Sequence, residues 1–348
     1  MNAPPAVPPA RPACNGAYFV ARTACPVCLS RNARTLYAGS YTEDPVKSFV
    51  LSHYKGQGTV NLDYLAGTDF IVDECGDCGT VYQRHVPNDL LLDKIYNEFI
   101  SQDTLYPRAM RNLTLPRFEF RAGELIELFS LLPKRPGEVR FLDYGFGYGS
   151  WSRIAVAMGA EVCATEISAE KIAYGSAIGV KMVDEAALAG MQFDIVHTEQ
   201  VFEHLLDPHG DFLKLGRLVA PGGIMKVSVP PAGNIRGLLA ARGMSAVSPL
   251  VSDWQSPAER RAAEANAGYM CIVPLEHVNV LTEKGVRLLA REAGLRLIGT
   301  VRQQAVPVST ASAGRFIRSL KELGRAAARV ALRRLARRDW GYYVLRRD

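Results

Sequence analysis

Four of the seven cysteines in this 348-residue sequence fall into two C-x-x-C pairs, Cys25 with Cys28 and Cys75 with Cys78. Each pair can fold into a tight knuckle that presents two sulfurs to one metal, and four thiolates complete a closed tetrahedral structural zinc site. The 46 residues between the pairs exceed the spacing of common zinc ribbons, so an insertion must loop out. The pattern predicts structural Zn²⁺, with iron or a redox-active pair as alternatives. Four protein ligands leave no open position for a catalytic metal.

Three glycines at alternate positions, Gly145, Gly147 and Gly149, follow a short apolar run in the segment FLDYGFGYG. Glycine allows the backbone to turn tightly into the next helix and to approach a bound ligand closely. Glu166 lies 21 residues after Gly145, at the end of the next expected strand, where a carboxylate can bind both hydroxyls of a ribose. The combination predicts a nucleoside-cofactor site, and a purely structural turn is the alternative.

The glycine spacing also bears on which cofactor is bound. Dehydrogenases that bind dinucleotides carry GxGxxG, in which the displaced third glycine lets a helix N-terminus meet a pyrophosphate. Here the spacing is GxGxG, and Asp143 stands two positions before the first glycine. An acidic group beside the loop suits the ammonium group of an amino acid better than a pyrophosphate.

These residues are distributed over a regular alternation of elements that starts near residue 139. Short apolar runs predict strands at 139–145, 161–167, 193–202, 222–230, 294–306 and 340–347. Amphipathic segments predict helices at 150–160, 168–179, 209–219 and 280–294. Strands separated by helices of this length imply βαβ units, and the expected fold class is therefore α/β with a mostly parallel sheet.

The ordered motifs resemble those of class I S-adenosylmethionine-dependent methyltransferases. FLDYGFGYG is similar to their first motif and EIS to their ribose-binding acid, while FDIVHTEQVFEHLLDP, LVAPGGIMKVSVP and LEHVNVLTEKGVRLLAREAG resemble later segments of one large branch. The resemblance implies a seven-stranded Rossmann-like sheet and S-adenosyl-L-methionine as cofactor. It assigns cofactor binding to Asp143, Tyr144, Gly145, Gly147, Gly149, Glu166, Ile167 and Glu199, the last near the adenine edge.

The N-terminal part extends the resemblance. CPVC, CGDCG and the following VYQRHVP are similar to the zinc-binding module of some deoxysugar, polysaccharide and natural-product methyltransferases. The expected organisation is a disordered tail at 1–22, a zinc-knuckle module at 23–95 and a methyltransferase domain at 96–314. That domain contains an insert at 231–275, which we interpret as a substrate lid. A basic amphipathic helix and a final strand occupy 315–348.

Methyl transfer from a sulfonium needs an acceptor that is close to the methyl group and deprotonated. His204 follows the strand at 193–202, at the edge where open α/β sheets bind ligands, and Glu203 is placed to orient it. His277 follows the insert and is expected to enter the same pocket from the other side. We predict Glu203, His204 and His277 as the catalytic group. A histidine that bonds to backbone at a helix start is the alternative for His204.

The formal charge of +6 is concentrated at one end. Residues 315–348 hold eleven Lys or Arg and three acidic residues, a net of +8, so the remaining chain carries −2. A nearly neutral body argues against extended nucleic-acid binding. Positions 316, 320, 323, 327, 330 and 331 form the apolar side of the helix expected at 315–337. This helix either contacts an anionic membrane or a phosphate-bearing substrate, or is solvated and packed on the domain.

The sequence favours a methyltransferase that acts on a small molecule, most readily on a hydroxyl of a sugar, glycolipid or secondary metabolite. An RNA methyltransferase that grips its substrate with the zinc module and a non-catalytic scaffold are the alternatives. Because no run approaches the ~18 apolar residues of a membrane span and the first twenty residues lack a hydrophobic signal region, we expect a soluble chain. C-x-x-C cysteines point to a reducing cytoplasm, with peripheral membrane contact as the variant that the basic helix allows.

Overall fold

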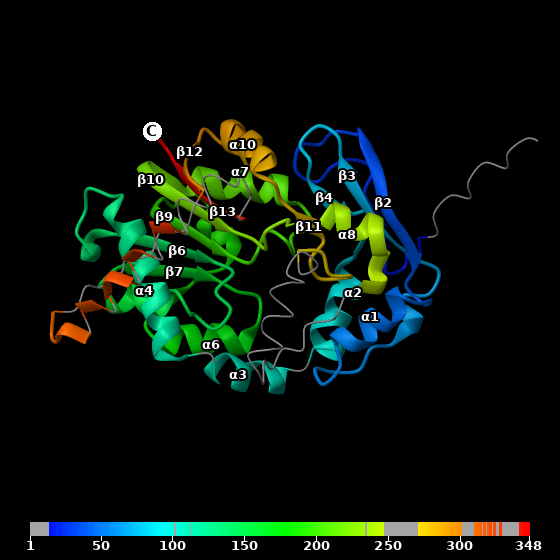
Figure 1. Cartoon of the computed structure of the whole chain (residues 1–348), viewed down its shortest axis with the longest axis horizontal. Helices are drawn as coiled ribbons and strands as arrows, with labels where there is room; N and C mark the ends of the chain where they lie inside the picture. Colours follow the sequence, from blue (N-terminus) through cyan, green and yellow to red (C-terminus); the bar gives the residue numbers. More distant parts are fainter. Residues whose placement is uncertain are drawn as a thin grey trace, which may run out of the picture.

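A computed structural model of the chain shows two lobes side by side, an N-terminal lobe in blue and cyan and a larger sheet-containing lobe in green (Figure 1). The structure describes residues 14–100, 102–111, 113–233, 235–246, 271–300, 310–314, 316–317, 319–321, 323–324, 327–328 and 341–348. Most of the tail expected at 1–22 therefore lies outside the described residues, as do positions 247–270 of the predicted lid and all of 329–340.

The larger lobe is built on a seven-stranded sheet in the order β12-β13-β10-β9-β6-β7-β8. Its strands are β6 Arg140–Tyr144, β7 Glu161–Thr165, β8 Lys181–Met182, β9 Phe193–Glu199, β10 Val219–Ser228, β12 Arg296–Gly299 and β13 Tyr342–Arg346. The pairs from β8 to β10 are parallel, while β13 runs antiparallel to both β10 and β12. This confirms the expected mostly parallel Rossmann-like sheet. The two-residue β8 is too short to give a sequence signal.

Helices cover both faces of this sheet, with α7 and α10 above it and α4 and α6 below it in Figure 1. The helices are α4 Leu115–Ser130, α5 Ser152–Ala157, α6 Ala169–Ala177, α7 Pro208–Leu218 and α10 Glu283–Glu292; short 3₁₀ turns lie at Pro136–Glu138 and Glu185–Leu188. Local sequence determines where α10 begins, because the Thr282 side chain accepts a hydrogen bond from the Gly285 N–H. Val286, Leu289 and Ala290 then form its buried face at the spacing of an amphipathic helix.

The N-terminal lobe contains a four-stranded antiparallel sheet in the order β11-β4-β3-β2 and a two-stranded sheet of β1 and β5. The strands are β1 Phe19–Ala21, β2 Ala33–Ser40, β3 Asp69–Cys75, β4 Val81–Gln83, β5 His85–Pro87 and β11 Asn279–Val280. The helices are α1 Val46–His53, η1 Leu62–Tyr64, α2 Asp89–Lys94 and the π-helical turn η2 Ile95–Phe99. The next helix, α3 Gln102–Arg111, lies below α6 of the larger lobe (Figure 1). Cys75 ends β3, and the turn that contains Cys78 leads into β4.

Two segments that we placed in the methyltransferase domain by sequence pack with the N-terminal lobe. Strand β11 pairs with β4, and helix α8 (Ile235–Arg242) lies beside β2 (Figure 1). The apolar residues of α8, of the turn η5 (Gly243–Ala246) and of 271–275 are buried in one cluster with Tyr41 and Phe70. Burial of this apolar surface anchors both ends of the predicted lid on the N-terminal lobe. The described parts of 231–275 are therefore part of a core.

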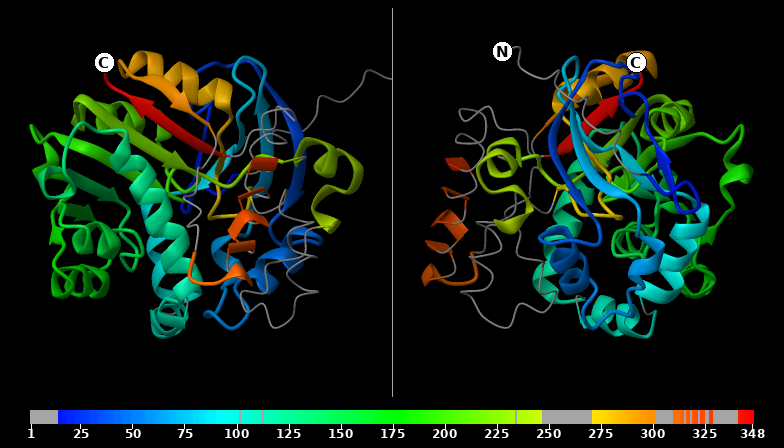
Figure 2. Two further views of the ribbon diagram at one scale, coloured as in Figure 1. Left: turned by 60° about the vertical axis from the view of Figure 1, so that its left-hand side comes forward. Right: turned by 90° about the vertical axis from the view of Figure 1, so that its right-hand side faces the viewer.

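In the basic C-terminal segment, the described residues between 313 and 328 are helical and are drawn in orange in Figure 2. Its apolar residues are exposed, by 41% at Phe316, 47% at Leu320 and 46% at Leu323. The apolar side that the sequence predicts is thus present at these positions and faces outward; Val330 and Ala331 lie outside the described residues. Among the residues with a described structure, none of the helices is both long and apolar enough to cross a bilayer.

Candidate functional site

The glycine loop lies where the strand order reverses. Strand β6 has β7 and β8 on one side and β9 and β10 on the other, so its carboxyl end opens into the crevice where open α/β sheets bind ligands. Gly145, Gly147 and Gly149 have φ of +85°, +57° and +63°, in the left-handed region that favours glycine. A Cβ on Gly145 would lie 2.6 Å from a Val201 methyl carbon, whereas one on Gly147 would meet no atom within 4 Å. The loop therefore needs glycine for its turns and leaves open space at its centre.

A cavity of about 460 Å³ adjoins this loop. Of the residues expected to bind cofactor, Asp143, Gly145, Gly147 and Glu199 line it. The other lining residues are Arg117, Phe120, Arg121, Phe146, Tyr148, Ser150, Trp151 and Gln200. The cavity thus combines two carboxylates, two arginines and several aromatic rings, a composition suited to a zwitterionic amino-acid group joined to an aromatic base.

Glu166 binds the glycine loop directly. Its carboxylate accepts hydrogen bonds from the N–H groups of Gly147 at 2.9 Å, Ile167 at 2.9 Å and Ser168 at 3.1 Å. Three backbone donors stabilise the ionised carboxylate and hold the loops after β6 and β7 together. Glu166 and Ile167 do not line the cavity as it is formed here, although the exposed Ile167 side chain lies beside the loop that does.

Asp143 and Tyr144 point to opposite sides of β6, because side chains alternate along a strand. The buried Asp143 carboxylate contacts His197 Nδ1 at 3.0 Å and accepts a hydrogen bond from the Ser152 hydroxyl at 2.5 Å. The Tyr144 hydroxyl donates instead to Glu185 at 2.7 Å, away from the cavity. Burial, with the Glu185 contact next, raises the pKa of Tyr144. The Tyr144 side chain therefore packs on the side of β6 opposite Asp143.

A buried charge network lies behind the cavity and was not expected from the sequence. Lys226 on β10 is fully buried and forms ion pairs with Glu199, which lines the cavity, and with Glu124 on α4 at 3.3 Å. Its ammonium group also lies 3.2 Å from His197 Nε2, and His197 contacts Asp143. The network connects both cavity carboxylates through β9 and β10. A lysine within an apolar strand pattern gives no local signal of such a network.

The two arginines of the cavity were also missed. Arg117 and Arg121 lie one helical turn apart on α4, and the Arg121 guanidinium lies 5.8 Å from the centre of the Trp151 ring. Their spacing places both on one face of the helix. Nothing in the sequence relates this helix to the glycine loop.

His204 and His277, which are 73 positions apart in the sequence, meet at the end of β9. Their ring centroids are 4.6 Å apart in an edge-to-face arrangement. Burial lowers the pKa of His204, so its ring is neutral at pH 7. The ring donates a hydrogen bond to the Glu276 backbone, and Nε2 lies 4.0 Å from a Glu203 carboxyl oxygen. A neutral imidazole held in this way can accept a proton.

Glu203 does not make the orienting contact that we expected, because 4.0 Å is too long for a hydrogen bond. Its side chain is fully buried, and within the described part of the chain neither carboxylate oxygen has a hydrogen-bond partner. Burial, with the charge of Glu199 adding to it, raises the pKa of Glu203 to about 8. The residue therefore holds a proton at neutral pH, and its oxygens lie within 4.8 Å of ring nitrogens of both histidines.

The neighbouring Glu276 is held by the N-terminal lobe. Its carboxylate lies 2.8 Å from His53 Nε2, with side-chain exposures of only 20% and 15%. Burial acts to raise the pKa of Glu276, but the hydrogen bond and charge of His53 outweigh it and lower the pKa to about 2. Leu275, directly before it, has φ +75°, a strained conformation for a branched residue. The backbone at 275–277 is thus constrained where His277 enters the cluster.

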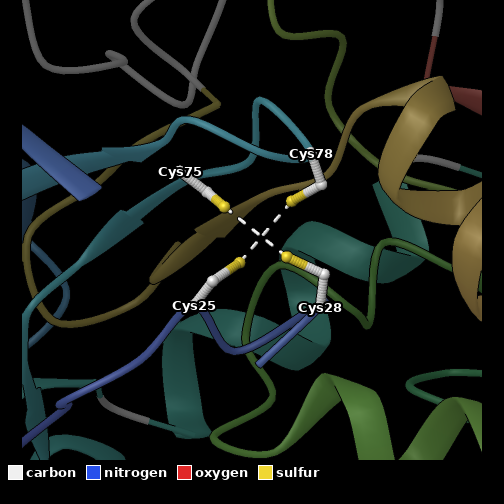
Figure 3. Close-up of side chains that lie close together, drawn as sticks. All are labelled: Cys25, Cys28, Cys75 and Cys78. Atoms are coloured by element: carbon white, nitrogen blue, oxygen red, sulfur yellow. Dashed lines mark hydrogen bonds between the residues drawn. The ribbon is translucent and has the colours of Figure 1, made fainter. Parts of the chain in front are cut away.

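The four cysteines lie together between the two lobes, with their sulfurs directed at a common centre (Figure 3). The Cys25 and Cys78 sulfurs are 3.6 Å apart, those of Cys28 and Cys75 are 3.5 Å apart, and all four lie within 4.8 Å of one another. A tetrahedral ion with metal–sulfur bonds of about 2.3 Å separates its ligands by about 3.8 Å. The hydrogen bond that Cys78 accepts from Cys25 lowers the pKa of the Cys78 thiol, which favours a thiolate. The geometry fits a four-thiolate metal site.

These features define a Rossmann-like α/β protein with a nucleoside-cofactor crevice at the carboxyl edge of its sheet. A family model described as "Methyltransferase domain" matches residues 117–299, just over half of the chain. The chain belongs to this family, the class I S-adenosylmethionine-dependent methyltransferases.

The curated relatives that match are ubiquinone biosynthesis O-methyltransferases. That of Sinorhizobium fredii is 32% identical over 134 residues, which cover 35% of this chain and 54% of the relative. That of Mesorhizobium japonicum is 34% identical over 134 residues, with 35% and 54% covered. The chain therefore spans about half the length of these relatives. The match supports the methyltransferase family.

Solved structures show only distant likeness. The plantazolicin methyltransferase BpumL in complex with SAH is 15% identical, with a TM-score of 0.41 over 70% of this chain and 88% of that one. An S-adenosylmethionine-dependent methyltransferase from Mesorhizobium loti is 17% identical, with a TM-score of 0.36 over 65% and 98%.

Proposed function

We propose that the protein transfers a methyl group from S-adenosyl-L-methionine to a small-molecule acceptor, a hydroxyl of a sugar, glycolipid or secondary metabolite. The observation that carries the proposal is the cavity at the end of β6, which the three-glycine loop and two carboxylates line. Relatives named O-methyltransferases support oxygen as the acceptor atom. The −2 charge of the chain outside 315–348 supports a small acceptor over RNA.

The residues around the cavity fit the parts of this cofactor. Asp143 and Glu199 offer carboxylates to its positive charges, and Arg117 and Arg121 offer guanidinium groups to its carboxylate. Glu166 fixes the loop and remains the candidate for the ribose hydroxyls. When bound, the cofactor supplies an electrophilic methyl group on sulfur. The protein supplies orientation and excludes water from the crevice.

We assign His204, His277 and Glu203 to the acceptor side. The neutral His204 ring takes the proton that the acceptor hydroxyl loses as the new oxygen–carbon bond forms. Protonated Glu203 beside it adds no negative charge to the pocket at neutral pH. His277 packs edge-on against His204 and limits the orientations of its ring.

We further propose that Cys25, Cys28, Cys75 and Cys78 hold a structural Zn²⁺. All four are protein ligands, so the coordination shell is closed to substrate, and the ion would join the knuckle at Cys25 to the turn between β3 and β4.

Calorimetric titration with S-adenosylhomocysteine, followed by a methyl-transfer assay on a panel of sugar, glycolipid and phenolic acceptors, tests the proposal. Wild-type protein should bind the nucleoside, and Glu166→Ala should weaken binding about tenfold or more, because loss of a charge-assisted hydrogen-bond set costs at least ~1.5 kcal/mol. Glu161→Ala is the control, because Glu161 lies at the opposite, exposed end of β7. Wild-type protein that binds no nucleoside would contradict the assignment.

A further inference from the structure

The two histidine-bearing segments are joined by backbone hydrogen bonds. The Glu203 carbonyl accepts from the N–H groups of Val278 at 2.7 Å and Asn279 at 3.1 Å. The Asn279 side chain donates to the carbonyls of Phe202 at 2.9 Å and Leu205 at 2.7 Å. These hydrogen bonds hold the turn after β9 against the start of β11, next to His204 and His277.

Arg22 of the N-terminal lobe reaches into this junction. Its Nη1 donates to the carbonyl of Val278 at 3.3 Å and to the Asn279 side-chain oxygen at 2.9 Å. Its Nη2 donates to the carbonyls of Leu205 at 3.3 Å and Leu206 at 2.9 Å. A single planar guanidinium therefore bonds to both segments at once, one or two residues beyond each histidine.

Arg22 is itself fixed in the N-terminal lobe. Its backbone N–H donates to the Arg84 carbonyl at 2.8 Å, and Nη1 also donates to the Gln83 carbonyl at 3.3 Å. The Gln83 side chain continues the contact, because its Nε2 donates to the carbonyls of Val273 at 2.7 Å and His277 at 3.0 Å. The end of β4 thus positions both the guanidinium and the turn that carries His277.

The chemistry of the acceptors explains why an arginine is present. The hydrogen-bond acceptors described for the Arg22 guanidinium are all neutral oxygens: four backbone carbonyls and one side-chain amide. Burial lowers the pKa of Arg22 to about 10, so the group remains charged at neutral pH. A rigid fork of donors can bridge several carbonyls in fixed directions, which the point charge of lysine cannot do.

We propose that Arg22 is a positioning residue for the acceptor side, which sets His204 and His277 relative to each other and makes the N-terminal lobe part of the catalytic apparatus. The expected effect of Arg22 on kcat rests on the proposed function, whereas its expected effect on the positions of the two histidines does not. The cofactor cavity lies on the other side of Glu199 and shares no residue with this junction. Loss of Arg22 should therefore affect the acceptor side and spare cofactor binding.

Steady-state kinetics of Arg22→Met and Arg22→Lys, with Arg84→Met as the matched control, test the kinetic consequence. Arg84 lies in the same lobe, and the hydrogen bonds described for its guanidinium go to Asp73 and Thr35 of that lobe. We expect kcat to fall about 10- to 100-fold in both Arg22 variants, as for a small misplacement of a catalytic group, with the Kd for S-adenosylhomocysteine within twofold of wild type. Guanidinium ion added to Arg22→Ala should restore part of kcat. An equal loss of kcat in Arg84→Met, or full activity in Arg22→Lys, would overturn the proposal.

Histidine-selective NMR tests the geometry without any acceptor. In the wild type, His204 is surrounded by Glu203, His277 and Glu276, and its ring should titrate below the usual value for histidine. In Arg22→Met the segments should separate and admit water, and the His204 pKa should move up toward about 6.5. It should not move in Arg84→Met. If Arg22→Met does not fold, Arg22→Lys decides: an unchanged His204 titration there refutes the positioning role, even if wild-type protein proves to methylate none of the acceptors.

Discussion

Replacement of Lys226 by methionine should be among the most damaging single changes in the sheet. The side chain is fully buried, and its ammonium group forms ion pairs with Glu199 and Glu124. The ammonium nitrogen also lies 5.1 Å from the centre of the Trp151 ring and 5.7 Å from the centre of the Tyr342 ring. Methionine fills a similar volume but leaves two carboxylates without their cation. Removal of one member of a buried ion-pair group costs about 3–5 kcal/mol of unfolding free energy.

Lys134→Met is the control against which this loss of unfolding free energy is compared. Lys134 also forms an ion pair, with Asp194 at 2.7 Å, but 43% of its side chain is exposed. Water reaches the Lys134 ammonium group, and the buried Asp194 keeps its hydrogen bond from the Arg140 N–H. Loss of Lys134 should therefore cost closer to the ~0–1 kcal/mol of an exposed pair, well below the loss for Lys226. Addition of Glu124→Gln to Lys226→Met should recover part of the stability, because it removes the charge of a buried carboxylate that has lost its contact with Lys226.

Urea unfolding followed by circular dichroism measures these differences, and calorimetry with S-adenosylhomocysteine measures the second consequence. Because Glu199 lines the cavity, we expect the nucleoside to bind more weakly to Lys226→Met than to Lys134→Met. If Lys226→Met loses no more unfolding free energy than Lys134→Met, the buried ion pairs of Lys226 do not stabilise the fold as we infer from their distances.

Two further predictions concern the metal and the pH dependence. Purified protein should contain one zinc per chain by elemental analysis; Cys78→Ser should lose most of the zinc and melt at a lower temperature, whereas Cys163→Ser, a buried cysteine outside the cluster, should keep it. An equal zinc content in the two variants would argue against the four-cysteine site. Burial lowers the pKa of His204, so the ring loses its proton at a lower pH than an ordinary histidine does. We therefore expect kcat to rise with pH below about 6.5 and then level off. His204→Gln should abolish this acidic limb, and a limb that persists would assign the proton to another group.

Local sequence was sufficient for the elements that follow a simple rule of periodicity or turn geometry. The glycines at 145, 147 and 149 adopt positive φ, and strands β6, β7, β9, β10 and β13 lie where apolar runs predicted them. The C-x-x-C spacing likewise identified four sulfurs that converge. Each of these signals depends on residues only a few positions apart, where backbone sterics and side-chain alternation dominate.

Tertiary structure decided how distant segments combine. The insert at 231–275 had the composition of a lid, yet the apolar residues at its described ends pack with Tyr41 and Phe70. Burial against these rings removes the apolar residues from water. Glu203 was adjacent to His204 in sequence and therefore the obvious orienting group, but its burial protonates it, and the histidine is bonded to the Glu276 carbonyl instead.

The sequence by itself determined the chemistry that the chain can perform: a glycine turn with acids beside it, paired histidines and four thiolates. Only the fold decided which of these groups share an environment, since desolvation and charge pairing depend on neighbours that lie tens or hundreds of positions away. Arg22 and Lys226 illustrate the point. Neither stands in a recognisable motif, and each acquires its role from carbonyls or carboxylates brought to it by packing.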